Sequence, residues 1–175
     1  MRLRRSLASL IALSLMTTGC VPTKDGEGNG MTTRAVEERA EQILRATKDV
    51  LGESGWTPHP TWVGCDAQGR GLVQLLFFVE RLKPMEGDLG ALSEKVAEKW
   101  AGLGLVARAQ PVSDRPGTYV VSDPPFLQGA KQDGTLTQLQ FSATFSGLQV
   151  LSPCVEGDLA QLNSPQPTLT PPSSP

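Results

Sequence analysis

The run from Leu72 to Leu82 is the feature that most constrains the fold of this chain. If it forms a strand, alternate side chains point to opposite faces, and both faces are then apolar. One face would carry Val73, Leu75, Phe77 and Val79, and the other Leu72, Leu76 and Phe78. A strand that is apolar on both faces lies inside a sheet rather than at its edge. The sequence therefore predicts a sheet in which this strand is central.

Two segments have the spacing of amphipathic helices. In the first, Thr32 or Thr33 can act as the N-cap and Gly52 as the stop signal. Its apolar positions recur every three or four residues: Val36, Ala40, Ile43, Thr47 and Val50/Leu51. In the second, Asp88 is the expected cap and Gly102 and Gly104 end the helix. Its apolar positions are Leu89, Leu92, Val96, Trp100 and Leu103.

The remaining segments indicate short strands separated by turns. Trp56–Pro60 is expected to be a loop because of Pro58 and Pro60. The strands expected on pattern are Thr61–Cys65, Leu105–Val112 and Thr118–Ser122, with turns at Asp66–Gly71, Pro84–Gly87 and Asp114–Gly117. Pro111 places the second of these strands at a sheet edge. Asp123–Gly134 is expected to be a long loop.

The alternation from Gln138 to Phe145 predicts a strand with one buried and one solvent-facing side. The solvent-facing side would carry Gln138, Gln140, Ser142 and Thr144, and the buried side Leu139, Phe141, Ala143 and Phe145. A hairpin at Ser146-Gly147 would return the chain through Leu148–Cys154. The order of elements predicts an α+β fold of two layers, in which an antiparallel β-sheet carries two helices on one face.

The N-terminus has the layout of an export signal. Arg2, Arg4 and Arg5 precede a short apolar stretch, Leu7–Met16, and small residues lead to Cys20. We expect residues 1–19 to be a signal peptide, cut between Gly19 and Cys20. Arg4-Arg5-Ser6-Leu7 also resembles a twin-arginine export motif, so the general secretory and twin-arginine routes both remain open. A plain secretory signal that leaves an unmodified Cys20 is the alternative to lipidation.

The chain has three cysteines, Cys20, Cys65 and Cys154. An odd number in an exported protein leaves one thiol to explain. If Cys20 carries a lipid, Cys65 and Cys154 can form one disulfide, which the oxidising environment outside the cytoplasm permits. The alternative is two buried thiols that lie apart. By the chain-entropy model, closing the long loop between Cys65 and Cys154 would stabilise the domain by about 4–5 kcal/mol.

These observations divide the chain into four parts. Residues 1–19 are the signal peptide, and residues 20–32 are a Gly-rich, lipidated and flexible tether. Residues 33–156 form the α+β domain. Residues 157–175 are expected to be a disordered, Pro-rich tail, because Pro and Ser dominate its end.

Thr18-Gly19-Cys20 resembles the end of the lipobox of bacterial lipoproteins, in which the cysteine is acylated and becomes the new N-terminus; Thr17 stands where that family has Leu. The domain is similar to the small LppA-like lipoproteins of mycobacteria and related actinobacteria. That similarity rests on the element order, on Trp100 followed by Gly102-Leu103-Gly104-Leu105, and on Ser152-Pro153-Cys154. It implies a lipid-anchored protein on the extracytoplasmic face of the cell membrane, and it implies no particular activity.

Charge narrows the range of partners. The formal net charge is -2, and the leader contributes only positive side chains, so the mature chain is more acidic still. An acidic surface does not favour the binding of nucleic acid, because contact with phosphates requires a patch of basic side chains. We expect the partner to be the membrane, through the lipid anchor, together with an envelope protein or a lipid ligand.

The sequence offers few residues for catalysis or metal binding. His59 is the single histidine, and it lies between two prolines in a predicted loop. One histidine and two cysteines cannot complete a four-ligand zinc site, so no metal or cofactor is expected. Glu80 and Asp66 could act as paired carboxylates, but nothing in the sequence fixes their separation. Gly69-Arg70-Gly71 lacks the pattern of a phosphate loop and favours a turn.

Two surfaces could bind a partner. Trp56 and Trp62 flank His59 and could anchor a protein or a glycan, although closing one end of the core is the simpler role. The polar strand face with Gln138 and Gln140 is the better candidate. We therefore predict a non-enzymatic accessory or binding module. A carrier of an apolar ligand, held near Leu92, Val96, Trp100 and Phe77, is the second hypothesis, and an envelope hydrolase is the third.

Overall fold

Strand β2, Leu72–Arg81, lies between two antiparallel neighbours in the computed structural model, which describes residues 30–65 and 71–164. Its neighbours are β1 (Trp56–Gly64) and β6 (Ser146–Leu151). Val73, Leu75, Phe77 and Val79 are buried on one face of β2. The central position predicted from the two apolar faces is therefore confirmed.

The sheet has seven antiparallel strands, six of them in the order β1-β2-β6-β5-β4-β3. The other strands are β3 (Arg108–Pro111), β4 (Tyr119–Asp123), β5 (Leu136–Phe141) and the two-residue β7 (Val155–Glu156), which pairs with the start of β2. Edge strand β3 ends at Pro111, as the sequence predicts. The two edges of the sheet are thus β1 and β3.

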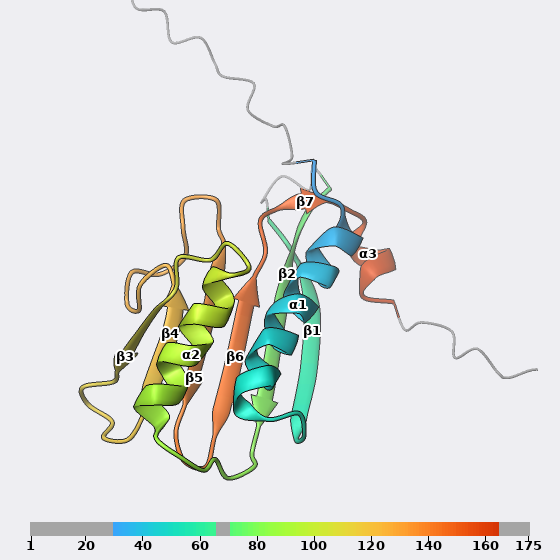
Figure 1. Cartoon of the computed structure of the whole chain (residues 1–175). Coiled ribbons are helices and arrows are strands. Elements are labelled where there is room, and N and C mark those ends of the chain that lie inside the picture. Colours follow the sequence, from blue (N-terminus) through green and yellow to red (C-terminus); the bar gives the residue numbers. More distant parts are fainter. Residues whose placement is uncertain (1–29, 66–70, 165–175) are drawn as a thin grey trace, which may run out of the picture.

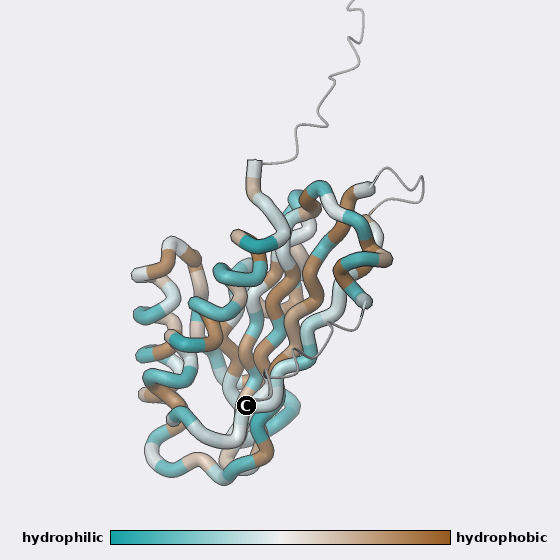
Figure 2. Tube along the Cα trace, turned by 90° about the vertical axis from the view of Figure 1, so that its right-hand side faces the viewer, coloured by the Kyte–Doolittle hydropathy of each residue, from teal (hydrophilic) through white to brown (hydrophobic). Residues whose placement is uncertain are grey.

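Both long helices lie on the same face of the sheet (Figure 1). Helix α1, Thr33–Leu51, is capped by Thr32, whose side chain accepts a hydrogen bond from the backbone N–H of Ala35. Helix α2, Leu89–Ala101, is capped by Asp88, whose carboxylate accepts hydrogen bonds from the backbone N–H groups of Gly90 and Ala91. Figure 2 shows the two layers from the side. The predicted α+β fold, an antiparallel sheet with two helices on one face and one disulfide, is confirmed.

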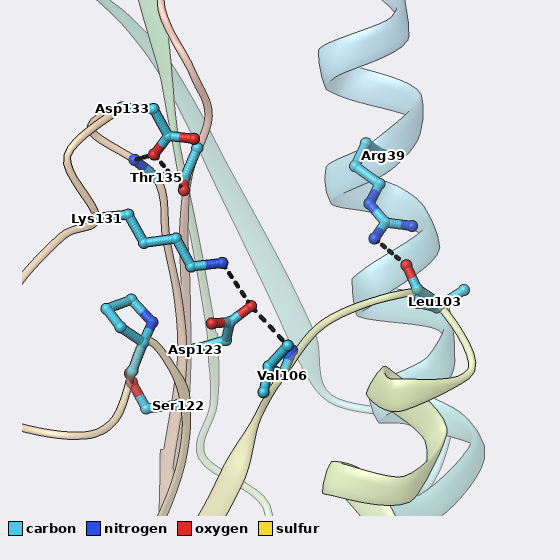
Figure 3. Close-up of polar contacts among 9 residues, drawn as sticks. Arg39, Leu103, Val106, Ser122, Asp123, Lys131, Asp133 and Thr135 are labelled. Carbon is cyan, nitrogen blue, oxygen red and sulfur yellow. Dashed lines mark hydrogen bonds and ion pairs between the residues drawn. The ribbon is translucent and has the colours of Figure 1, made fainter.

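A single apolar core fills the space between the helices and the sheet. Val96 and Trp100 of α2 are fully buried in it. The indole N–H of Trp100 donates to Thr47 Oγ1 at 3.1 Å, and that hydroxyl donates to the carbonyl of Ile43 at 2.8 Å. The polar atoms of this contact are therefore satisfied where α1 meets α2. Arg39 of α1 also donates to the carbonyl of Leu103, just after α2 (Figure 3).

The predicted disulfide between Cys65 and Cys154 is present. Cys65 directly follows β1, and Cys154 lies between β6 and β7. The two residues are 89 positions apart in the sequence. The bond therefore joins the first strand to the last part of the sheet, as expected.

Two expectations about strands need correction. Trp56–Pro60 is not a loop but the first half of β1. Proline is tolerated there because β1 is an edge strand, and a missing N–H on its outer side breaks no pairing. The strand expected at Leu105–Val112 is shorter, and β3 covers only Arg108–Pro111.

The hairpin between β5 and β6 also differs from the prediction. Strand β5 ends at Phe141, and the turn is Ser142–Phe145, closed by a hydrogen bond from Ser142 N to Phe145 O at 2.8 Å. Ser146 and Gly147 belong to β6. Ala143 and Thr144 are exposed in the turn, so the alternating pattern extends beyond the strand itself.

The part of the predicted tail that the structure describes is ordered against the domain. Helix α3, Leu159–Leu162, is capped by Asp158, and Leu162 packs against the core. It lies beside β1 (Figure 1). The expectation of a disordered tail from residue 157 is therefore wrong for residues 157–164. Residues 165–175 lie outside the described part.

Candidate binding surface

Within residues 30–65 and 71–164, no helix covers the central strands on the face of the sheet opposite α1 and α2, and we call this face the open face. The strand register places a row of side chains across it, because partners in antiparallel strands share a face. His59 pairs with Phe78, Phe78 with Gln149, and Gln149 with Gln138. The row therefore crosses β1, β2, β6 and β5.

The aromatic half of this row is exposed to solvent. The imidazole of His59 stacks on the ring of Phe78, with centroids 6.5 Å apart and an interplanar angle of 24°. Phe78 is 40% exposed, unlike the residues on the other face of β2. His59 Nε2 also lies 3.5 Å from Glu80 Oε1, and the two side chains are 52% and 39% exposed.

The other half of the row consists of glutamines. Gln138 and Gln149 face each other across β5 and β6, and both are half-buried. Gln140 lies two residues along β5, on the same face. None of these three amides forms a hydrogen bond with another residue in the parts of the chain that the structure describes. Their donors and acceptors are available to a ligand or to water.

Phe145 adds a third aromatic ring, next to the row. Its ring lies close over Gly147, where an added Cβ would come within 2.9 Å of the Phe145 ring and 3.7 Å of the Phe78 ring. A side chain at position 147 would therefore displace the end of the Phe145 ring. The open face thus has an aromatic part, formed by His59, Phe78 and Phe145.

A loop covers the remaining part of this face, over β4. Residues 124–134 follow Asp123, and Val120 and Ser122 are fully buried. The loop is fixed by the carboxylate of Asp123, which is 3% exposed and accepts from Lys131 Nζ at 2.8 Å and from Val106 N at 3.1 Å (Figure 3). The surface that remains accessible is therefore formed by β1, β2, β6 and β5.

The same loop ends in a turn in which Thr135 binds Asp133. Thr135 donates both its hydroxyl, at 2.7 Å, and its backbone N–H, at 3.0 Å, to Asp133 Oδ1. These two hydrogen bonds lower the pKa of Asp133 below its ordinary value, and the bond from the hydroxyl contributes more than the bond from the backbone N–H. The turn packs near the start of β2, where Gln74 donates to the carbonyl of Gly134 at 3.0 Å.

The structure brings together two residues that the sequence considered separately. His59 and Glu80 are neighbours on adjacent strands. The sequence instead suggested Asp66 as the partner of Glu80 in a pair of carboxylates. Asp66 and Gly69-Arg70 lie outside the described residues, so no separation of the two carboxylates can be given. His59 receives no hydrogen bond from a serine, threonine or cysteine within residues 30–65 and 71–164.

The two tryptophans of the proposed aromatic anchor contribute to packing. Trp62 is 4% exposed in the core. Trp56 is half-buried, donates its indole N–H to the carbonyl of Gly52 at 2.8 Å, and lies beneath the guanidinium of Arg81. Both residues therefore close the core near β1, which is the simpler of the two roles considered from the sequence.

A groove of about 580 Å3 lies between α1 and α2. Leu92 and Val50 contribute to its wall, but charged side chains make up much of the rest: Asp49, Lys95, Glu98 and Lys99. Val96 and Trp100, which the carrier hypothesis places around a ligand, are fully buried in the packed core. Leu92 is the residue that this groove shares with the set named by the carrier hypothesis.

Some of the sequence-based site assignments lie outside the described residues. These include Gly19 and Cys20, the cleavage and lipidation positions. Within residues 30–65 and 71–164, no group of three or more potential metal ligands is present. In the same residues no helix has the length and apolar character needed to cross a membrane.

The row from His59 to Gln138 was only partly visible in the sequence. The alternation at Gln138 and Gln140 identified one strand of it. Gln149 alternates in the same way between Leu148 and Val150, so its solvent-facing position could have been found. The position of His59 and Phe78 in this row depends on the pairing of β1 with β2. No local sequence pattern encodes that pairing.

No protein-family model matches this sequence, and no curated protein is significantly similar to it. Among solved structures, the fold is similar to a DUF4853 family protein from Actinomyces odontolyticus. The two share 16% sequence identity with a TM-score of 0.44, over 74% of this chain and 70% of the other. This chain thus has a structural neighbour from an actinobacterium, at a level of similarity that assigns it no function.

Proposed function

We propose that this chain is a lipid-anchored, extracytoplasmic binding module of the cell envelope, without enzymatic activity, and that its open face binds the partner. The acyl chain on Cys20 would hold the domain at the membrane surface. The open face would remain available for a second molecule.

The observation that carries the proposal is the difference between the two faces of one sheet. One face is covered by α1 and α2, and its side chains form the core. The other face presents the exposed ring of Phe78 and the glutamine amides of β5 and β6. An aromatic group surrounded by polar groups with unused hydrogen-bonding capacity is typical of a binding surface.

The sheet edges favour binding on the face rather than by addition of a strand. Asn163 binds the backbone N–H and C=O of Trp62 from outside β1. Backbone groups of every second residue in a strand point to the same side, so those of Pro58 and Pro60 also point outward. On the other edge, the N–H of Val112, just after β3, points inward and donates to the carbonyl of Thr118. The backbone nitrogen of the preceding residue, Pro111, therefore points outward. Proline at these positions removes the N–H that an added strand would need.

The surroundings of His59 support a non-enzymatic role. A hydrolase with a serine, threonine or cysteine nucleophile needs that hydroxyl or thiol within hydrogen-bonding distance of its base. The side chain of His59 is instead placed against Phe78 and Glu80. The disulfide also accounts for two of the three cysteines in the sequence, which leaves Cys20 for the lipid.

Site-specific photo-crosslinking in living cells tests the proposal. A photoreactive amino acid placed at Gln149 or Gln138 should give a crosslinked product, whereas one at Glu94, exposed on α2, should not. Equal crosslinking from the helix side, or none from the open face, would contradict the assignment of the surface. Membrane fractionation of the Cys20→Ala variant tests the anchor separately.

A further inference from the structure

We propose that the ligand of the open face is a neutral polysaccharide, held by the row from His59 to Gln138. This inference deepens the proposed function and depends on it, because it names the chemical class that the same face binds. The argument rests on the composition of the row, on its accessibility and on its charge.

The row has the shape of an elongated site. Its four residues lie on four adjacent strands, and neighbouring strands are about 4.8 Å apart. The row therefore extends about 14 Å across the sheet. Gly147 and the turn Ser142–Phe145 border it on one side, and the half-buried Leu76, Leu136 and Leu151 border it on the other. A site of this shape fits several units of a linear polymer.

The amides supply the hydrogen-bonding groups that sugars require. A glutamine side chain offers both an acceptor oxygen and two N–H donors. A hydroxyl group likewise donates one hydrogen bond and accepts others, so adjacent hydroxyls of a sugar ring can bind both parts of one amide. Gln138 and Gln149 face each other directly, and neither amide is used by another residue in the described part of the chain.

The aromatic half supplies a surface for the apolar side of a sugar ring. A pyranose has one face made mainly of C–H groups, which packs against the negative face of an aromatic ring. Phe78 is exposed by 40% on a rigid strand, and His59 stacks beside it. An aromatic ring next to planar amides combines both kinds of contact in one row.

The charge of the row favours a neutral polymer over an anionic one. Its four residues include no lysine or arginine, and the nearest acid, Glu80, lies against His59. Arg108 belongs to the same register but lies on the edge strand, beyond the buried Ser122. An anionic polymer would need positive charge along its length, which this row lacks.

Titration of the purified full-length protein in detergent with defined polymers tests the inference. The probes are soluble mannan, glucan and xylan, with polygalacturonate as the anionic control. We expect at least one neutral polymer to bind, and Gln138→Ala and Gln149→Ala each to weaken binding by about three- to tenfold, the loss of a neutral hydrogen bond. Gln42→Ala, an exposed glutamine on α1, is the matched control and should bind as the parent does.

Phe78 provides a second and independent readout. Phe78→Ala should abolish binding, whereas Phe78→Trp keeps an aromatic platform and should preserve it. Thermal unfolding of each variant verifies that the domain is folded. Failure of all neutral polymers to bind, equal binding of polygalacturonate, or equal loss in Gln42→Ala would each overturn the inference.

Failure of the inference can be distinguished from failure of the proposed function. If Gln149 crosslinks to a protein in cells while no polysaccharide binds in solution, the open face is a binding surface with a different ligand, and only the inference fails. If neither crosslinking nor titration detects a ligand, both fail.

Discussion

The side chain of Asn163 binds both backbone groups of Trp62, although the two residues are 101 positions apart. Asn163 Oδ1 accepts from Trp62 N at 3.2 Å, and Nδ2 donates to Trp62 O at 2.9 Å. An amide side chain thus does what a neighbouring strand would do at the edge of the sheet. This contact fixes the end of the domain beyond residue 156 and completes the protection of β1 that Pro58 and Pro60 begin.

Asn163→Ala should lower the free energy of unfolding by about 1–2 kcal/mol, because two half-buried backbone groups lose their partners. Urea unfolding measures this as a lower midpoint with an unchanged slope. Asn163→Asp keeps the acceptor but loses the donor, so an intermediate loss is expected. If Asn163→Ala leaves the midpoint where it is, α3 does not contribute to the fold in solution.

Thr47→Val should destabilise the domain by about 1–3 kcal/mol, because the buried indole N–H of Trp100 then has no acceptor. Valine has nearly the same shape as threonine, so the change tests the hydroxyl rather than the packing. Thr47→Ser retains the hydroxyl and should keep the hydrogen bond, with a smaller loss from the missing methyl group. Equal stability of the valine variant and the parent would show that this bond is not needed to join α1 to α2.

Loss of the disulfide should cost about 2–5 kcal/mol of stability. The single variants Cys65→Ala and Cys154→Ala should be destabilised about as much as the double variant, because each removes the same covalent bond. Thermal unfolding with and without reductant measures the effect in the parent protein. Reductant should not change the melting temperature of the double variant. A parent whose two thiols can both be labelled without reductant would contradict the bond.

Thr135→Val should raise the pKa of Asp133 toward its ordinary value, because the hydroxyl hydrogen bond holds that pKa down. The backbone N–H bond remains in the variant, so the return should be partial. A lowered pKa in the folded state stabilises the fold above the ordinary pKa, and this contribution is lost as the pH falls through the folded value. NMR titration of the Asp133 carboxyl carbon measures both values, and identical values would exclude the role of the hydroxyl.

The sequence predicts most of the architecture because local patterns determine it. Two apolar faces identified β2 as central, Asp88 predicted the start of α2, and the odd number of cysteines predicted the pairing of Cys65 with Cys154. These signals depend on neighbouring residues or on simple counting. They do not depend on knowing which strands lie side by side.

The errors arise where tertiary contacts decide the local structure. Pro58 and Pro60 indicated a loop, but an edge strand accepts proline on its outer side. The alternation through Phe145 hid the turn that begins at Ser142. Helix α3 has too few residues to give a periodic pattern, and the bond from Asn163 to Trp62 holds it in place. The row on the open face depends in the same way on strand register, which the sequence does not reveal.

The central claim is that this domain functions outside the cytoplasm at a membrane surface, and the intact mass of the native protein tests it most directly. Protein extracted from the membrane fraction of its own cells should have the mass of residues 20–175 plus acyl groups, and its first residue should be the modified Cys20. A mass that includes residues 1–19, or an unmodified Cys20, would contradict the claim.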